Sequence, residues 1–201
     1  HLTVRDMDGI VKLDDVSFTA NSGEILGIAG ISGCGQKELL EAIAGLQPTE
    51  SGSISYITES GEKEELIGKD PLAIADMGVS LSFVPEDRLG MGLVGSMDLT
   101  DNMMLRSFRK GKGWFANRKA PKQLAEQVVK ELEVNTPGVS TPVRRLSGGN
   151  VQKVLVGREI ASAPTVLLTA YAVRGLDIHS SYTIYDLINR QKESGVAVVY
   201  V

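Results

Sequence analysis

One segment constrains the fold more than any other, because an apolar run leads through a glycine-rich turn into a helical pattern. The apolar run covers Glu24 to Ala29, and the helical pattern places Leu39, Leu40 and Ile43 on one face before Gly45. A continuous apolar run between turn residues is typical of a buried strand, and glycine often ends a helix. Strand, loop and helix in this order predict an α/β fold whose loop glycines can cradle phosphate.

The end of the chain repeats the alternation of helix and strand, which predicts a parallel core sheet. The expected elements are a helix near Val151 to Ala161, a strand at Val166 to Leu168, a helix near Ser181 to Glu193, and a strand at Val196 to Val201. Three short β-like runs open the chain and indicate an antiparallel layer. These runs are Leu2 to Val4, Val16 to Phe18 and Ser53 to Ile57.

A helical insert is expected between the two parts of the sheet. From Asp98 to Arg145 the sequence has no strand pattern, but it has helical stretches near Thr100 to Ser107 and Pro121 to Leu132. The 201 residues suit one domain. Because the chain starts at His1 without an initiator methionine and stops inside an apolar run, we expect it to be a piece of a longer subunit.

Composition narrows the class of protein. A formal net charge of -4 argues against a nucleic-acid binder, which would need a basic surface. The single cysteine, Cys34, excludes an intrachain disulfide and fits a reducing cytosol. No apolar run approaches the roughly 20 residues that span a bilayer, so we expect any membrane connection to come through a partner.

The glycine-rich turn has the frame of a phosphate loop without its working side chains. It consists of Gly30, Ile31, Ser32, Gly33, Cys34, Gly35, Gln36 and Lys37. The pattern G-x-x-x-x-G-K-[ST] needs lysine where Gln36 stands and a hydroxyl where Lys37 stands. Lys37 cannot substitute, because one helical position turns a side chain by roughly 100°. Losing a charge-assisted bond of about 1.5–3 kcal/mol weakens nucleotide binding by one to two orders of magnitude. By itself, the loop is equally consistent with a structural turn.

A second glycine-containing helix start lies further along, at Leu146, Ser147, Gly148, Gly149 and Asn150. A serine followed by two glycines presents N–H groups, a hydroxyl and a favourable helix dipole to an anion. An ordinary helix cap would explain a lone Ser-Gly-Gly. The whole octapeptide through Lys153, however, resembles the signature of ABC transporters, and the phosphate-loop frame lies upstream in the expected order.

The resemblance covers the entire chain and implies an ABC-type P-loop NTPase fold of the α/β class, with a parallel core sheet, an antiparallel β subdomain and a helical insert. It divides the chain into an ATPase core with the β layer at 1–85 and 146–201, and a helical subdomain at 86–145. It also matches Glu86 to the Q-loop position, where most ABC ATPases carry glutamine. The stretch Met7 to Lys12 offers no aromatic to stack on adenine, and the switch histidine would lie beyond Val201.

The stretch from Pro164 to Asp177 resembles the Walker B strand running into the D-loop. In that match Ala170 replaces the Mg²⁺-binding aspartate, Tyr171 replaces the glutamate that polarises water, and Leu176 and Asp177 retain the D-loop pattern. We therefore expect no metal ligand and no intact catalytic residue in this domain. A general base alone contributes about 10²–10⁴ in rate, so the domain alone is expected to be inactive.

The motifs together resemble the second, often degenerate, ATP-binding domain of the large subunit that drives simple-sugar and nucleoside importers, with a lean towards the nucleoside branch. The resemblance implies that Ser147, Gly148 and Gly149 complete, in trans, an ATP and Mg²⁺ site on the N-terminal nucleotide-binding domain of the same subunit. It also implies permease subunits and, indirectly, a solute-binding protein as partners, no nucleic acid, and a peripheral position on the cytoplasmic face of the cell membrane.

A basic stretch within the insert suits contact with membrane proteins or anionic headgroups, although a solvated loop explains it equally well. It contains Arg106, Arg109, Lys110, Lys112, Arg118 and Lys119, together with Trp114 and Phe115. Two other functions stay open at this point. One is a soluble ABC-type ATPase, and the other is a regulatory nucleotide-binding module that is not tied to transport.

Overall fold

The computed structural model describes residues 1–6, 8–31, 33–107 and 117–201. The chain forms two compact units. The first unit contains His1–Phe83, Thr165–Ala170 and Lys192–Val201, and the second contains Val84–Pro164 and Tyr171–Gln191. The division into core and helical subdomain that we expected at residues 85 and 145 stays a prediction.

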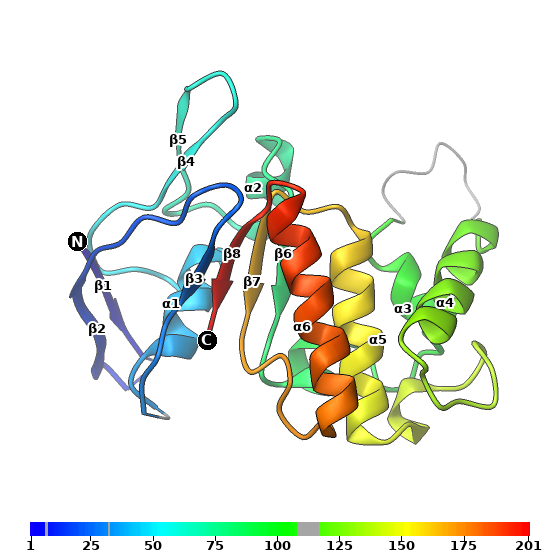
Figure 1. Cartoon of the computed structure of the whole chain (residues 1–201). Coiled ribbons are helices and arrows are strands. Elements are labelled where there is room, and N and C mark those ends of the chain that lie inside the picture. The colour runs from blue at the N-terminus through cyan, green and yellow to red at the C-terminus, as the bar shows by residue number, and fades with distance from the viewer. Residues whose placement is uncertain (7, 32, 108–116) are drawn as a thin grey trace. The chain divides into compact units, whose positions relative to one another are not determined.

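A four-stranded sheet with the order β3-β8-β7-β6 forms the centre of the first unit (Figure 1). Its strands are β3 (Ile25–Gly27), β6 (Leu81–Val84), β7 (Val166–Thr169) and β8 (Ala197–Tyr200). The pairs β3 with β8 and β7 with β8 are parallel, which confirms the predicted parallel core sheet. The helix α1 (Gln36–Ile43) follows β3 after the glycine loop and gives way to Gly45, whose φ is 74°.

Two antiparallel pairs complete the β structure of the first unit. They are β1 (Leu2–Arg5) with β2 (Val11–Val16), and β4 (Ser55–Ile57) with β5 (Lys63–Glu65). The antiparallel layer is thus confirmed, but the expected strand at Val16 to Phe18 is wrong. The strand lies earlier because Leu13 is its buried residue, and the adjacent acidic residues stay exposed.

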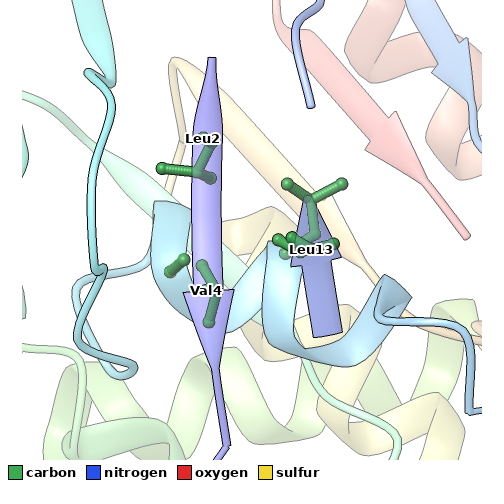
Figure 2. Packing of buried hydrophobic residues seen from close by; sticks show 5 residues of the cluster. Leu2, Val4 and Leu13 are labelled. Atoms are coloured by element: carbon green, nitrogen blue, oxygen red, sulfur yellow. The ribbon is translucent and has the colours of Figure 1, made fainter. Parts of the chain in front are cut away.

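The layer packs on α1 through a small apolar cluster, part of which Figure 2 shows. Leu2 and Val4 of β1 and Leu13 of β2 lie against Leu39 and Ala42 of α1. Burying a side chain of this size contributes about 1.5–3 kcal/mol, so this cluster holds α1, the helix that follows the glycine loop, against the β layer.

The helix α2 (Pro71–Asp76) was not predicted, because six residues are too few for a periodic pattern. Its start has a clear local cause: Asp70 accepts a hydrogen bond from Ala73 N at 2.8 Å, and Pro71 occupies the first turn. Ile74 then packs with Leu66 and Val79 in a second cluster of the first unit.

The second unit is helical. It contains the π-helical turn η1 (Arg88–Gly92), α3 (Leu99–Met104), α4 (Lys119–Glu131), the 3₁₀ turn η3 (Val143–Arg145), α5 (Gly148–Ala161) and most of α6 (Ile178–Glu193). The helices predicted near these positions are confirmed. Within the described part of residues 98–145, the only β feature is an isolated bridge between Asp98 and Pro142, as the absence of a strand pattern predicted.

Close packing and a buried ion pair hold the second unit together. A Cβ on Gly157 of α5 would lie 2.6 Å from Val128 Cγ1 of α4, so the two helices approach at a position that only glycine allows. Glu159, also on α5, is 2% exposed and lies 2.8 Å from Arg158 and 2.6 Å from Arg106. Burial lowers the pKa of Arg158, which also donates to Gly92 O at 2.7 Å.

Candidate functional site

The glycine loop lies between β3 and α1 in the first unit, as predicted. Gly33 and Gly35 have φ values of 86° and 92°, in the left-handed region that favours glycine. Gly35 also approaches β2 closely, since a Cβ there would lie 2.8 Å from Leu13 Cδ2 and would overlap Lys12 O. The last glycine of the frame is therefore required by packing, whether or not phosphate binds. Cys34 is exposed, and Ser32 lies outside the described residues.

The side chains of Gln36 and Lys37 leave the loop in different directions. Gln36 is only 6% exposed, and its amide covers Gly30 so closely that a Cβ on that glycine would overlap it. Lys37 is 57% exposed, and its Nζ lies 3.7 Å from Glu41 Oε1 on its own helix. An uncharged amide thus occupies the place beside the loop glycines, and the neighbouring ammonium is paired elsewhere.

The end of β7 lies in the first unit, and the residue that follows the strand has no carboxylate. Ala170 follows the strand directly and is 3% exposed. The preceding residue, Thr169, has a buried hydroxyl without a hydrogen-bond partner among the described residues. Mg²⁺ prefers charged oxygen ligands, so a methyl group at Ala170 and an ammonium at Lys37 do not suit it. No group of three or more His, Cys, Asp or Glu side chains in the described residues could hold a metal ion.

Tyr171 begins the next part of the second unit with a φ of 52°, which is rare for a bulky residue. The guanidinium carbon of Arg174 lies 5.8 Å from the centre of its ring, within the range of a cation–π interaction. Arg174 also forms an ion pair with Glu86. The positions matched to the Q-loop and to the catalytic glutamate are thus linked through one arginine, which the sequence did not predict.

The residues matched to the signature form the start of α5. Ser147 is the N-cap, and its hydroxyl oxygen accepts from Asn150 N at 3.5 Å and from Asn150 Nδ2 at 2.9 Å. Val151 N donates to Ser147 O at 2.9 Å. The N–H groups of Gly148 and Gly149 have no acceptor among the described residues, as expected in the first turn of a helix. The N–H donors of Gly148 and Gly149 and the helix dipole at this end of α5 suit an anion.

The residues matched to the D-loop pack directly beside this helix start. A Cβ on Gly149 would lie 3.3 Å from Leu176 Cδ2 and 3.8 Å from Gly175 O. Asp177 accepts from Ser180 N at 2.9 Å and from Ser180 Oγ at 2.7 Å, and these two bonds lower the pKa of its carboxyl. Asp177 therefore caps α6, which explains why this helix begins three residues before the predicted Ser181.

Comparison with known proteins shows the family to which the chain belongs. A family model described as "ABC transporter" matches residues 13–169. The chain belongs to the ABC transporter family.

The relatives and solved structures agree with this family. The chain is 36% identical to the guanosine import ATP-binding protein NupO of Bacillus subtilis, over 98% of this chain and 38% of that protein. It is 38% identical to the xylose import ATP-binding protein XylG of Moorella thermoacetica, over 96% of this chain and 36% of that protein. The dimeric, post-hydrolysis ATP-binding cassette MJ0796 bound to ADP and Pi has the same fold, with a TM-score of 0.81 and 22% identity over 100% of this chain and 84% of that one.

The basic stretch of the ABC domain is only partly described. Arg109, Lys110, Lys112, Trp114 and Phe115 lie outside the described residues. Of the others, Arg106 pairs with Glu159, while Arg118 lies 2.9 Å from Asp98 and 2.9 Å from Asp101. Among the described residues, no helix is both long and apolar enough to cross a membrane.

Arg88 is the residue of the ABC domain that sequence reasoning missed. Its Nη1 donates to Gly148 O at 3.0 Å, and its Nη2 donates to Arg174 O. Sequence analysis assigned no role and no contact to Arg88. Its partners lie 60 and 86 residues away and are backbone atoms, which leave no side-chain pattern to read.

Proposed function

We propose that this ABC domain is the second, C-terminal nucleotide-binding domain of the large ATP-binding subunit of an importer for nucleosides or simple sugars. The printed functions of its relatives, guanosine import and xylose import, support this class of solute. The chain spans 38% and 36% of the lengths of these two relatives, which is consistent with one of two domains on a longer chain.

In this proposal the domain's own site does not hydrolyse ATP. Gln36 supplies no charge to the phosphates, Ala170 offers no oxygen to Mg²⁺, and Tyr171 stands where the resemblance expects the glutamate that polarises water. The loss of the base alone costs about 10²–10⁴ in rate. The glycine loop retains its backbone frame, so weak nucleotide binding is compatible with this arrangement.

The active role of the domain lies at its signature. The main support for this role is that the N–H groups of Gly148 and Gly149, at the start of a 14-residue helix, have no acceptor in the part of the chain that the structure describes. Together with the Ser147 hydroxyl, they would complete the ATP and Mg²⁺ site of the N-terminal domain of the same subunit. Preorganised N–H donors aimed at phosphate charge are among the strongest contributions to phosphoryl-transfer catalysis.

The remaining partners follow from the importer assignment. We propose that permease subunits bind the helical part of the domain, that a solute-binding protein acts through these permeases, and that nucleic acid plays no role. The subunit would then be peripheral on the cytoplasmic face of the cell membrane. Membrane-facing contact by the basic stretch depends on its cationic side chains.

The isolated domain provides the test. We expect nearly no steady phosphate release from Mg-ATP, while the full subunit hydrolyses ATP. Calorimetry with Mg-ATP and a phosphate-release assay on both proteins measure this difference. Micromolar affinity with steady turnover by the isolated domain would refute the proposal and favour a self-sufficient soluble ATPase. Tight binding without turnover, in a subunit that shows no hydrolysis either, would favour a nucleotide sensor.

A further inference from the structure

A single side chain connects the signature and the D-loop within the second unit. The guanidinium of Arg88 donates through Nη1 to Gly148 O at 3.0 Å and through Nη2 to Arg174 O. Arg88 is half-buried, and its pKa is lowered by burial and by the neighbouring charge of Arg174. The guanidinium therefore has two fixed acceptors in a site partly shielded from water.

Each of these carbonyl groups belongs to a planar peptide unit that also contains the N–H of the next residue, which points the opposite way. A hydrogen bond that fixes Gly148 O therefore fixes the direction of the Gly149 N–H. In the same way, the bond to Arg174 O fixes the N–H of Gly175, one residue before Leu176. Consecutive glycines have the most flexible backbone in a chain. A hydrogen bond from a distant side chain therefore restricts the conformation of Gly148 more than it would restrict that of another residue.

We propose that Arg88 is a positioning residue that aims the Gly149 N–H of the signature at nucleotide bound by the partner domain. This inference rests on the proposed function. Glu86, two residues before Arg88, pairs with the side chain of Arg174. One short segment thus holds Arg174 by both its side chain and its backbone, and it holds the first residue of α5 as well. A displacement of residues 86–88 would move the signature and the D-loop together.

The geometry requires arginine in particular. A guanidinium has five donors in a rigid planar fork and can serve two carbonyls at once, whereas a lysine ammonium is a point charge on a flexible stem. Arg88→Lys therefore keeps the charge and the apolar stem but loses the simultaneous hold on both carbonyls. Arg88→Ala removes the hold entirely.

The experiment compares the full subunit with its Arg88→Ala, Arg88→Lys and Arg190→Ala variants. Arg190 is an exposed arginine of α6 and serves as the matched control. Three quantities are measured: kcat and KM for ATP, affinity of the partner's phosphate loop for a fluorescent ATP analogue, and the melting temperature. We expect kcat to fall about tenfold or more in Arg88→Ala and less in Arg88→Lys, because bonds from a charged donor are lost. Analogue affinity and the behaviour of Arg190→Ala should stay unchanged.

An unchanged kcat in both Arg88 variants would overturn the inference. A fall in kcat that is proportional to the fall in melting temperature across all variants would overturn it too, because lost stability would then explain the lost activity. If Arg88→Ala does not fold, Arg88→Lys decides alone: a lower kcat at an unchanged melting temperature supports positioning, and an unchanged kcat refutes it. Failure of the proposed function is distinguishable, because then Gly149→Asp would also leave hydrolysis intact. If Gly149→Asp abolishes hydrolysis while the Arg88 variants are normal, only the role of Arg88 is wrong.

Discussion

Replacing Gln36 with lysine tests whether the glycine loop can still hold phosphate. Gln36 is the first residue of α1 and is 6% exposed, with its amide lying over Gly30. A lysine stem follows the same path and brings an ammonium to these glycines. Charge-assisted hydrogen bonds contribute about 1.5–3 kcal/mol, so ATP should bind roughly 10 to 150 times more tightly. Without ATP, the unpaired buried ammonium should lower the melting temperature, and ATP should restore it.

Hydrolysis should not follow from this change, because Ala170 and Tyr171 still provide neither a metal ligand nor a base. Calorimetry with ATP and a phosphate-release assay on the isolated domain measure both effects. Lys37→Ala is the control: its ammonium pairs with Glu41 on the same helix, so its loss should leave the affinity nearly unchanged. Robust turnover by Gln36→Lys would show that the Walker B match is misaligned. An unchanged affinity would show that the loop is only a structural turn.

Two further predictions concern stability. Glu159→Ala should lower the free energy of unfolding by about 3–5 kcal/mol, because buried Arg158 loses its counter-charge; a loss below about 1 kcal/mol in chemical denaturation would contradict the role of this pair. Burial raises the pKa of Glu41 above its ordinary value of 4.5, so the folded state disfavours the ionised form and stability falls as pH rises through this range. Glu41→Gln should therefore raise the melting temperature at pH 7 more than at pH 3.5, and an equal effect at both pH values would refute this reasoning.

The sequence predicts the parts of the fold that have a regular spacing of apolar residues or a long apolar run. The helix after the glycine loop and the alternating elements from Val151 onward were found because each buries at least one apolar face. The strand before the loop was found from its apolar run, although Ile25 and Leu26 of β3 are only half-buried. The strand β5 was missed because Lys63–Glu65 is charged throughout and so contains no apolar residue that would mark a strand. The strand β2 was placed too late because Asp14 and Asp15 interrupt the apolar pattern that Leu13 anchors.

The sequence predicts the features of the candidate site that depend on residue type alone, such as the missing phosphate lysine at Gln36 and the missing metal ligand at Ala170. It was not predictable where backbone atoms make the contact, as for Arg88. Gly149, at the start of α5, is half-buried beside Leu176. An added side chain there would meet the D-loop as well as any nucleotide, so substitutions at Gly149 affect two motifs at once.

The most direct test of the central claim is ATP hydrolysis by the full subunit carrying Gly149→Asp. If the signature faces nucleotide on the partner domain, the new carboxylate meets phosphate charge. Two like charges about 4 Å apart cost about 4 kcal/mol at an effective dielectric constant of 20, which corresponds to roughly a thousandfold loss of activity. Gly138→Asp is the matched control, because a Cβ on Gly138 meets nothing within 4 Å.

The measurement is the steady-state rate of phosphate release from Mg-ATP by the unmodified subunit and both variants, with melting temperatures recorded alongside. We expect Gly149→Asp to abolish most hydrolysis and Gly138→Asp to retain it, with both variants folded. Full hydrolysis by a folded Gly149→Asp subunit would mean that the signature of this domain takes no part in the partner's ATP site.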